Sequence, residues 1–305
     1  MAEPTEQAIR LKPVRGRKLR DGMWVVVADG SEPLVVSEPV AHALRAQDDH
    51  ASIIAPLAAT LSDAGFMCDF SEEVRQPPAA PVSGRWKVAR ATLWVAGAAL
   101  CPSATVLLLQ GGIPTGADVI SAGSHPLLVI AVALALAITT AVSHELAHIG
   151  FGRRFARPGG TVRIRVLQAA ATTNLTHVWA WPLSPRLSAV VAGVVVDFAF
   201  LTTALAWRAL TGSWIATVAV AVMVVRLVWQ FRFHRNCDGR HMAKMLLDAP
   251  TIDTDTRKLL TAQLWTSAPI TPWLWLALVA VGALAELALL AIWLVPAILR
   301  LLGVL

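Results

Sequence analysis

Charged side chains are scarce in this chain of 305 residues. Lys, Arg, Asp and Glu make up 15% of it, whereas hydrophobic residues make up 56%. Soluble globular domains carry about 25% charged residues, so the composition argues against an ordinary soluble protein of this length. It predicts a mainly α-helical protein that crosses a lipid bilayer several times.

Cysteine is rare and tyrosine is absent. The three cysteines, Cys68, Cys101 and Cys237, are scattered without a CxxC pair, which argues against a disulfide framework and a thiolate metal site. A metal would therefore need His and carboxylate ligands. The twelve Trp side chains are typical of anchors at the membrane interface and do not indicate a cofactor site.

We also expect no secretory signal peptide. Residues 1–18 are polar and basic with no apolar core, so we expect internal segments to direct insertion and the N-terminus to stay in the cytosol. Cytosolic Lys and Arg explain the formal net charge of +6, and we expect no nucleic-acid partner. The abundance of Ala, Val and Arg suggests a GC-rich bacterial genome, and hence a bacterial cell membrane.

Residues 1–70 have the pattern of a small separate domain. Apolar runs at Met23–Val27 and Leu34–Val36 predict two strands joined by a tight turn. Ser37 can cap a first helix, and a second is expected over residues 52–64. Two strands and two short helices predict a winged-helix-like α+β module.

The remainder is expected to be a proline-rich linker, residues 71–85, and a membrane domain, residues 86–305. Five apolar stretches there are each close to the length that crosses a hydrocarbon core of about 30 Å. They are Ala89–Gln110, Pro126–Phe151, Leu187–Ala206, Trp214–Phe231 and Trp273–Leu299. The predicted fold is thus a polytopic α-helical bundle of about five spans with a small N-terminal cytosolic domain.

The connecting loops predict the orientation. Residues Gly111–His125 and Thr211–Ser213 carry no Lys or Arg, whereas the loops after the second and fourth spans are basic. The loop after the second span holds Arg153, Arg154, Arg157, Arg163, Arg165 and Arg186. The positive-inside rule therefore places the basic loops in the cytosol and the C-terminus outside, with Arg208 and Arg300 as exceptions.

His144-Glu145-Leu146-Ala147-His148 lies at the end of the second apolar stretch. Residues four apart share a helix face, so both imidazoles can reach one metal ion, and Glu145 can serve as a general base. His144 lies about 18 residues into the span, about 27 Å from its outer start and near the cytosolic boundary. Ionisable groups at membrane depth are costly without a function.

A third metal ligand is expected beyond the fourth span, which ends on the same side. Asp238-Gly239 follows there, and a carboxylate oxygen would complete a His, His, Asp set with one open position for water. The sequence therefore predicts a catalytic Zn²⁺ site with His144, His148 and Asp238 as ligands and Glu145 as the catalytic base.

These motifs resemble the site-2 protease family of intramembrane zinc metalloproteases, whose members carry HExxH on one membrane helix and a DG motif on a later one. The resemblance covers most of residues 126–247 and implies that Asp238 is the third zinc ligand. Asn236–Met242 looks most like the peptide zinc metalloprotease branch, from which Arg240 departs where an aromatic is usual. Ala192-Gly193-Val194 with Asp197 resembles a further motif of that branch without its proline.

The N-terminal domain resembles the PqqD-like leader-recognition modules of ribosomal peptide natural-product pathways. That resemblance implies that a precursor or leader peptide adds as a strand to a sheet edge, in a groove formed by Val25, Val27, Val35 and the first helix. The alternative is a small cytosolic domain that only stabilises or regulates the membrane part.

The leading hypothesis is therefore a zinc metalloendopeptidase that cleaves a precursor or leader peptide near the cytosolic face during peptide maturation. One alternative is a site-2-type protease that cuts a membrane-anchored regulator. Another is a non-catalytic membrane protein that binds leader peptide for export or immunity.

Further polar residues have simpler expected roles. We expect Asp197, Arg226 and Glu286 to pair with one another inside the bundle, and a packing role is favoured for His177. His234 and His241 lie near Asp238 as candidate groups that orient a ligand.

Overall fold

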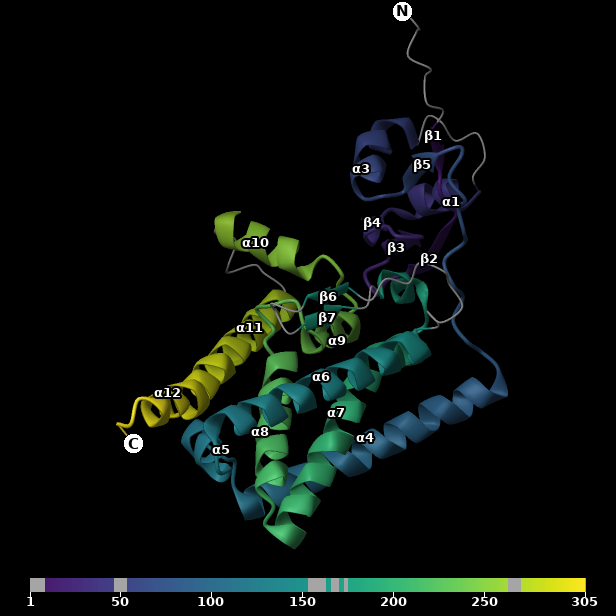
Figure 1. The fold of residues 1–305 in the computed structure, drawn as a ribbon. Helices are drawn as coiled ribbons and strands as arrows, with labels where there is room; N and C mark the ends of the chain where they lie inside the picture. The colour runs from purple at the N-terminus through teal and green to yellow at the C-terminus, as the bar shows by residue number, and fades with distance from the viewer. Residues whose placement is uncertain are drawn as a thin grey trace, which may run out of the picture. The chain divides into compact units, whose positions relative to one another are not determined.

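The computed structural model is mainly helical and describes residues 9–46, 54–152, 163–165, 170–172, 175–262 and 270–304 (Figure 1). Arg153, Arg154 and Arg157 of the expected basic loop lie outside these residues. The chain forms two compact units. Unit 1 comprises Met1–Pro81, Leu175–Arg186 and Lys244–Thr254, and unit 2 comprises Val82–Asn174, Leu187–Ala243 and Asp255–Leu305.

Unit 1 contains two small antiparallel sheets. Strands β2 (Val14–Lys18), β3 (Trp24–Ala28) and β4 (Leu34–Val36) form one sheet in the order β2-β3-β4, and β1 (Ile9–Leu11) pairs with β5 (Met67–Asp69). The helices are α1 (Glu38–Ala46), the 3-10 turn η1 (Ala55–Leu57) and α3 (Ala58–Asp63). The two strands and the first helix expected from the sequence are present, whereas β1, β2 and β5 were not anticipated.

Strand β3 is the centre of unit 1. Val26 packs into a core with Leu44 of α1 and Leu61 of α3. Val25 and Val27, on the opposite face of the strand, have no exposed surface either. The 3-10 turn η3 (Thr176–Ala180) packs against β3, which explains why the strand is apolar throughout instead of alternating.

Polar contacts tie the later segments of unit 1 to its sheet. Arg17 of β2 forms an ion pair with Asp248, and Arg186 binds the same carboxylate at 3.2 Å. The indole Nε1 of Trp181 donates a hydrogen bond to the carbonyl oxygen of Pro78 at 2.8 Å. Residues 73–82 of the proline-rich segment form neither helix nor strand. The hydrogen bond from Trp181 nevertheless holds the backbone of this segment at Pro78.

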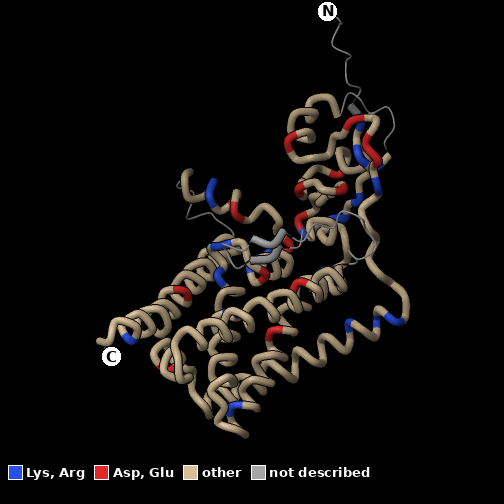
Figure 2. Tube along the Cα trace, viewed as in Figure 1, with Lys and Arg blue, Asp and Glu red and all other residues tan. Residues whose placement is uncertain are grey.

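Unit 2 contains the apolar helices. Among the described residues, four helices are long and apolar enough to cross a membrane, which identifies a membrane protein. They are α4 (Gly84–Gly111), α6 (Pro126–Phe151), α7 (Leu183–Thr211) and the continuous helical run Ile270–Leu301, in which α11 (Ile270–Leu289) is followed by a π-helical turn (Leu290–Leu294) and α12 (Val295–Leu301). Charged residues are few along these helices (Figure 2).

The fourth expected span is the shorter helix α8 (Trp214–Gln230), with 17 residues. It runs in the same direction as α6: Val218, near the start of α8, packs with Val129 near the start of α6, and Gln230, at the end of α8, reaches His144 near the end of α6. Helix α8 therefore contacts α6 near the start and near the end of α6, although it is shorter than the four long helices.

The remaining described elements connect the long helices. They are α5 (Gly116–Ala122), the strand pair β6 (Arg163–Arg165) and β7 (Ala170–Thr172), α9 (Asp238–Leu247) and α10 (Ile252–Ala262). The two basic residues that oppose the expected orientation have local partners. Arg208 donates to the carbonyl oxygens of Gly111 and Gly112 at the end of α4, and Arg300 donates to the hydroxyl of Ser121 in α5.

Candidate metal centre

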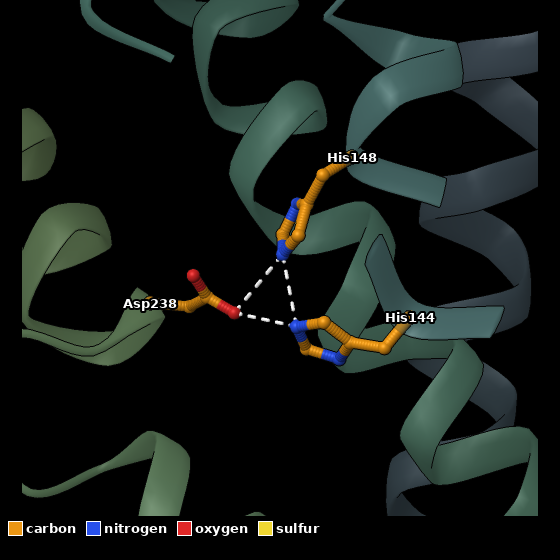
Figure 3. Close-up of side chains that lie close together, drawn as sticks. All are labelled: His144, His148 and Asp238. Carbon is orange, nitrogen blue, oxygen red and sulfur yellow. Dashed lines mark hydrogen bonds and ion pairs between the residues drawn. The ribbon is translucent and has the colours of Figure 1, made fainter. Parts of the chain in front are cut away.

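Helix α6 brings two imidazoles to one buried point. His144 and His148 lie one turn apart, and each is only 2% exposed. Their Nε2 atoms are 2.9 Å apart (Figure 3). Glu145 follows His144 on the same helix and is partly exposed.

Asp238, the first residue of α9, joins the two histidines. One of its carboxylate oxygens lies 2.8 Å from Nε2 of His144 and 3.0 Å from Nε2 of His148 (Figure 3). The three side chains together could hold a metal ion. The motif on the second apolar stretch and the Asp-Gly motif after α8 thus meet, as the sequence predicts.

The far nitrogen of each imidazole is held by an acceptor. Nδ1 of His144 lies 2.8 Å from a carboxylate oxygen of Asp197, and Nδ1 of His148 lies 2.8 Å from the carbonyl oxygen of Ala189. A carboxylate and a carbonyl only accept, so both Nδ1 atoms carry the proton and donate it. In the neutral tautomer this leaves the Nε2 lone pairs directed at Asp238.

This arrangement suits a cation. Two imidazole lone pairs and an acceptor-only carboxylate converge within 3.0 Å, and such a group is stable only with a positive charge among its members. Two His nitrogens and one carboxylate oxygen, each imidazole held from behind, form a donor set that binds divalent metals. The residues present therefore fit a metal ion.

Gly193 of α7 leaves room for the two rings. A Cβ atom at this position would lie 2.6 Å from Nε2 of His144 and 2.6 Å from Nε2 of His148. No side chain fits there without displacing the imidazoles. The glycine of the Ala192-Gly193-Val194 motif thus lines the metal centre.

The neighbours of Asp238 also affect its charge. Burial opposes ionisation, but the imidazoles of His148 and His144 outweigh it and hold the pKa of the Asp238 carboxyl below its ordinary value. Burial raises the pKa of the adjacent Cys237 thiol, whose sulfur donates instead to the carbonyl oxygen of Arg232. Cys237 therefore has the character of a protonated, structural thiol.

The ionisable residues within the apolar helices are only partly paired as expected. Asp197 and Arg226 do form an ion pair, at 3.1 Å, but Asp197 also binds His144 and so belongs to the metal centre. Glu286 does not join them. It binds Arg232 and His234 because these residues follow α8 on the side that faces α11.

Two other histidines have different surroundings. His177 lies in unit 1, where its ring contacts the ring of Trp181 at 5.2 Å, in agreement with the packing role. His241 lies on α9, one turn after Asp238, and stays a candidate for orienting that ligand.

Sequence patterns did not identify two of the groups around the imidazoles. The side-chain nitrogen of Gln230 lies 3.4 Å from Nε2 of His144, and the carbonyl oxygen of Ala189 receives the proton of His148. A polar side chain at the end of the mostly apolar α8 is a usable signal for Gln230. A backbone carbonyl leaves no signal in the sequence.

No protein-family model, curated protein or solved structure matches the chain. The chemistry of the centre is therefore argued from its own residues.

Proposed function

We propose that this protein is a zinc metalloendopeptidase of the bacterial cell membrane, similar to the peptide zinc metalloprotease branch of the site-2 proteases. The observation that carries the proposal is the convergence of His144, His148 and Asp238 beside Glu145. A His, His, carboxylate set with an adjacent glutamate is the arrangement of catalytic zinc sites that hydrolyse peptide bonds.

The residues of the site have different roles in this reaction. His144, His148 and Asp238 would hold Zn²⁺, while Asp197 and Ala189 fix the two imidazole rings. When bound, Zn²⁺ polarises a peptide carbonyl and activates water at neutral pH. The Glu145 carboxylate takes the proton from the attacking water and passes it to the amine that leaves when the C–N bond breaks.

We further propose that unit 1 is cytosolic and recruits a precursor or leader peptide for maturation. Among the described strands, β4 pairs only with β3, so its other edge offers backbone groups to an added strand. Val25 and Val27, expected in the docking groove, have no exposed surface, which leaves the partly exposed Val35 and helix α1 as its walls.

The test of the enzyme assignment compares Glu145→Gln with wild type. Full-length protein in lipid nanodiscs is incubated with short precursor peptides encoded beside its gene, and the products are identified by mass spectrometry. We expect equal zinc content but cleavage slower by roughly 10²- to 10⁴-fold in the variant. Ser143→Ala, which removes a hydroxyl that donates to the carbonyl oxygen of Thr139, is the matched control on α6.

Each other outcome has a definite meaning. Cleavage by Glu145→Gln at the wild-type rate would contradict the enzyme assignment. If a membrane-anchored regulator were cut while precursor peptides were not, the recruitment role of unit 1 would be wrong although the protease remained. Peptide binding without any cleavage by wild type would favour a leader-binding protein for export or immunity.

A further inference from the structure

The ligand Asp238 follows a segment with neither helix nor strand. Residues 231–237 connect α8 to α9, and hydrogen bonds from Phe233 to the carbonyl oxygen of Phe231 and from Cys237 to that of Arg232 lie within this connection. The backbone N–H of Arg235 donates to the carbonyl oxygen of Arg232, and Arg240 donates to the carbonyl oxygen of Phe233. A ligand on such a connection needs support from a rigid element if it is to stay in place.

Helix α11 supplies this support through Glu286. One oxygen of its carboxylate lies 2.8 Å from Nη1 of Arg232, and the other lies 2.6 Å from Nε2 of His234. These side chains are between 11% and 23% exposed, so the contacts are partly shielded from water. A carboxylate within an apolar helix is costly unless it is paired, which favours retention of both contacts.

The same face of α11 approaches the connection closely. Gly282 lies one turn before Glu286, and a Cβ atom there would lie 2.5 Å from the backbone nitrogen of Phe233. Two turns earlier, the ring of Trp275 lies 5.4 Å from the guanidinium of Arg240, next to the ligand's own turn of α9. Three positions on one helix face thus meet residues 231–240.

We propose that Glu286 is a positioning residue for the metal ligand Asp238. It holds Arg232 and His234, thereby fixes residues 231–237 against α11, and so keeps the Asp238 carboxylate beside the two imidazoles. The last apolar helix is then a part of the metal centre's support. This inference rests on the zinc centre of the proposed function.

The test measures metal affinity in Glu286→Gln. Zn²⁺ and Co²⁺ alone are titrated into full-length protein in nanodiscs, in competition with a coloured chelator. We expect affinity to fall by roughly 10- to 100-fold, the usual effect of removing a group that supports a ligand. The visible absorption bands of bound Co²⁺ should also shift, because the Asp238 carboxylate loses its fixed position. Arg300→Gln is the control, because it removes a charge from the same helical run at a side chain that donates to the hydroxyl of Ser121. It should change neither the metal affinity nor the Co²⁺ absorption bands.

A double-mutant cycle separates positioning from general damage. In an Asp238→Ala background the ligand is gone, so Glu286→Gln should cause no further loss of affinity. An equal loss in both backgrounds, or wild-type affinity and an unchanged Co²⁺ spectrum in the single variant, would overturn the proposal. If Glu286→Gln does not fold, His234→Gln replaces it in the same measurements. This variant removes one of the two partners of Glu286 without changing a residue of α11.

The two proposals fail in different ways. Wild-type protein that binds no zinc would remove the basis of the proposed function itself. Wild-type protein that binds zinc and cleaves peptide, with a Glu286→Gln variant of unchanged affinity, would leave the protease standing and reject only the positioning role.

Discussion

Asp197 accepts a hydrogen bond from Nδ1 of His144 at 2.8 Å, and its side chain is completely buried. Arg226 of α8 binds the same carboxylate, so a charged pair and the imidazole of His144 form one chain of contacts across three helices. The carboxylate fixes both the ring orientation and the tautomer, which is how outer groups tune a metal ligand.

Replacing Asp197 with Asn should weaken metal binding. The amide keeps the size of the side chain but loses the charge that binds Arg226 and the strong acceptor for His144, so we expect about 10- to 100-fold lower zinc affinity. Competition titration with a chelator measures this. Thr202→Val, on the same helix, removes a hydroxyl that donates to the carbonyl oxygens of Phe198 and Leu100, away from the imidazoles, and is the control. If Asp197→Asn binds zinc with unchanged affinity, Asp197 does not support metal binding through His144, and its role is to pair with Arg226.

Gly193→Ala should damage the centre by steric overlap. The added Cβ would lie 2.6 Å from both Nε2 atoms, and forced overpacking costs about 1–3 kcal/mol. If the imidazoles move to relieve the overlap, zinc affinity falls by about 5- to 150-fold. At Gly97 an added Cβ would meet only Cγ2 of Val195, at 3.1 Å, so Gly97→Ala should bind zinc normally. Normal zinc affinity in Gly193→Ala would show that the backbone of α7 moves to relieve the overlap, while the imidazoles keep their positions.

Local sequence patterns were sufficient for the elements with strong periodicity. The bounds of α6 agree with the predicted span Pro126–Phe151, because Pro126 suits the first turn of a helix and Gly152 follows its last residue. The grouping of His144, His148 and Asp238 was also predictable, since HExxH places two imidazoles on one helix face and the fourth apolar stretch indicated where Asp238 would lie.

The rest depended on tertiary contacts that sequence patterns do not encode. Strand β2 has the sequence Val-Arg-Gly-Arg-Lys, which does not alternate, and its place in the sheet comes from pairing with the apolar β3. The burial of Val25 and Val27 depends on η3, which follows about 150 residues later in the chain. The prediction that Glu286 pairs with Asp197 and Arg226 was wrong, because Arg226 binds Asp197 while Arg232 and His234, beyond the end of α8, lie beside Glu286.

Helix α8 should cross the membrane despite its length. It contacts α6 near both of its ends, so the end of α8, which Asp238 follows, lies on the same side of the membrane as His148. Five crossings would place the two termini on opposite sides, whereas four would place them on the same side. Alkaline phosphatase, which needs disulfides and an oxidising compartment, should therefore be active when fused to the C-terminus and inactive when fused to the N-terminus. Equal activity of the two fusions would contradict the five-span topology.

Asp248 should be the residue on which the integrity of unit 1 depends most. Its side chain is 6% exposed and binds both Arg17 and Arg186, and the latter is only 2% exposed. Its backbone has a φ of 57°, which Asn tolerates, so Asp248→Asn removes the charge without backbone strain. Loss of one partner of a buried ion pair leaves the other charge uncompensated and costs about 3–5 kcal/mol.

This cost should appear as faster hydrogen exchange in the strands of unit 1. Peptides from β2 and β3, followed by mass spectrometry on the full-length protein, should lose protection in Asp248→Asn, while peptides from α6 should not change. Glu38→Gln breaks the exposed pair with Lys18 and should leave exchange nearly unaltered, because water screens that contact. Equal protection in Asp248→Asn and Glu38→Gln would mean that apolar packing of β3 against η3 holds the unit together without the buried ion pair.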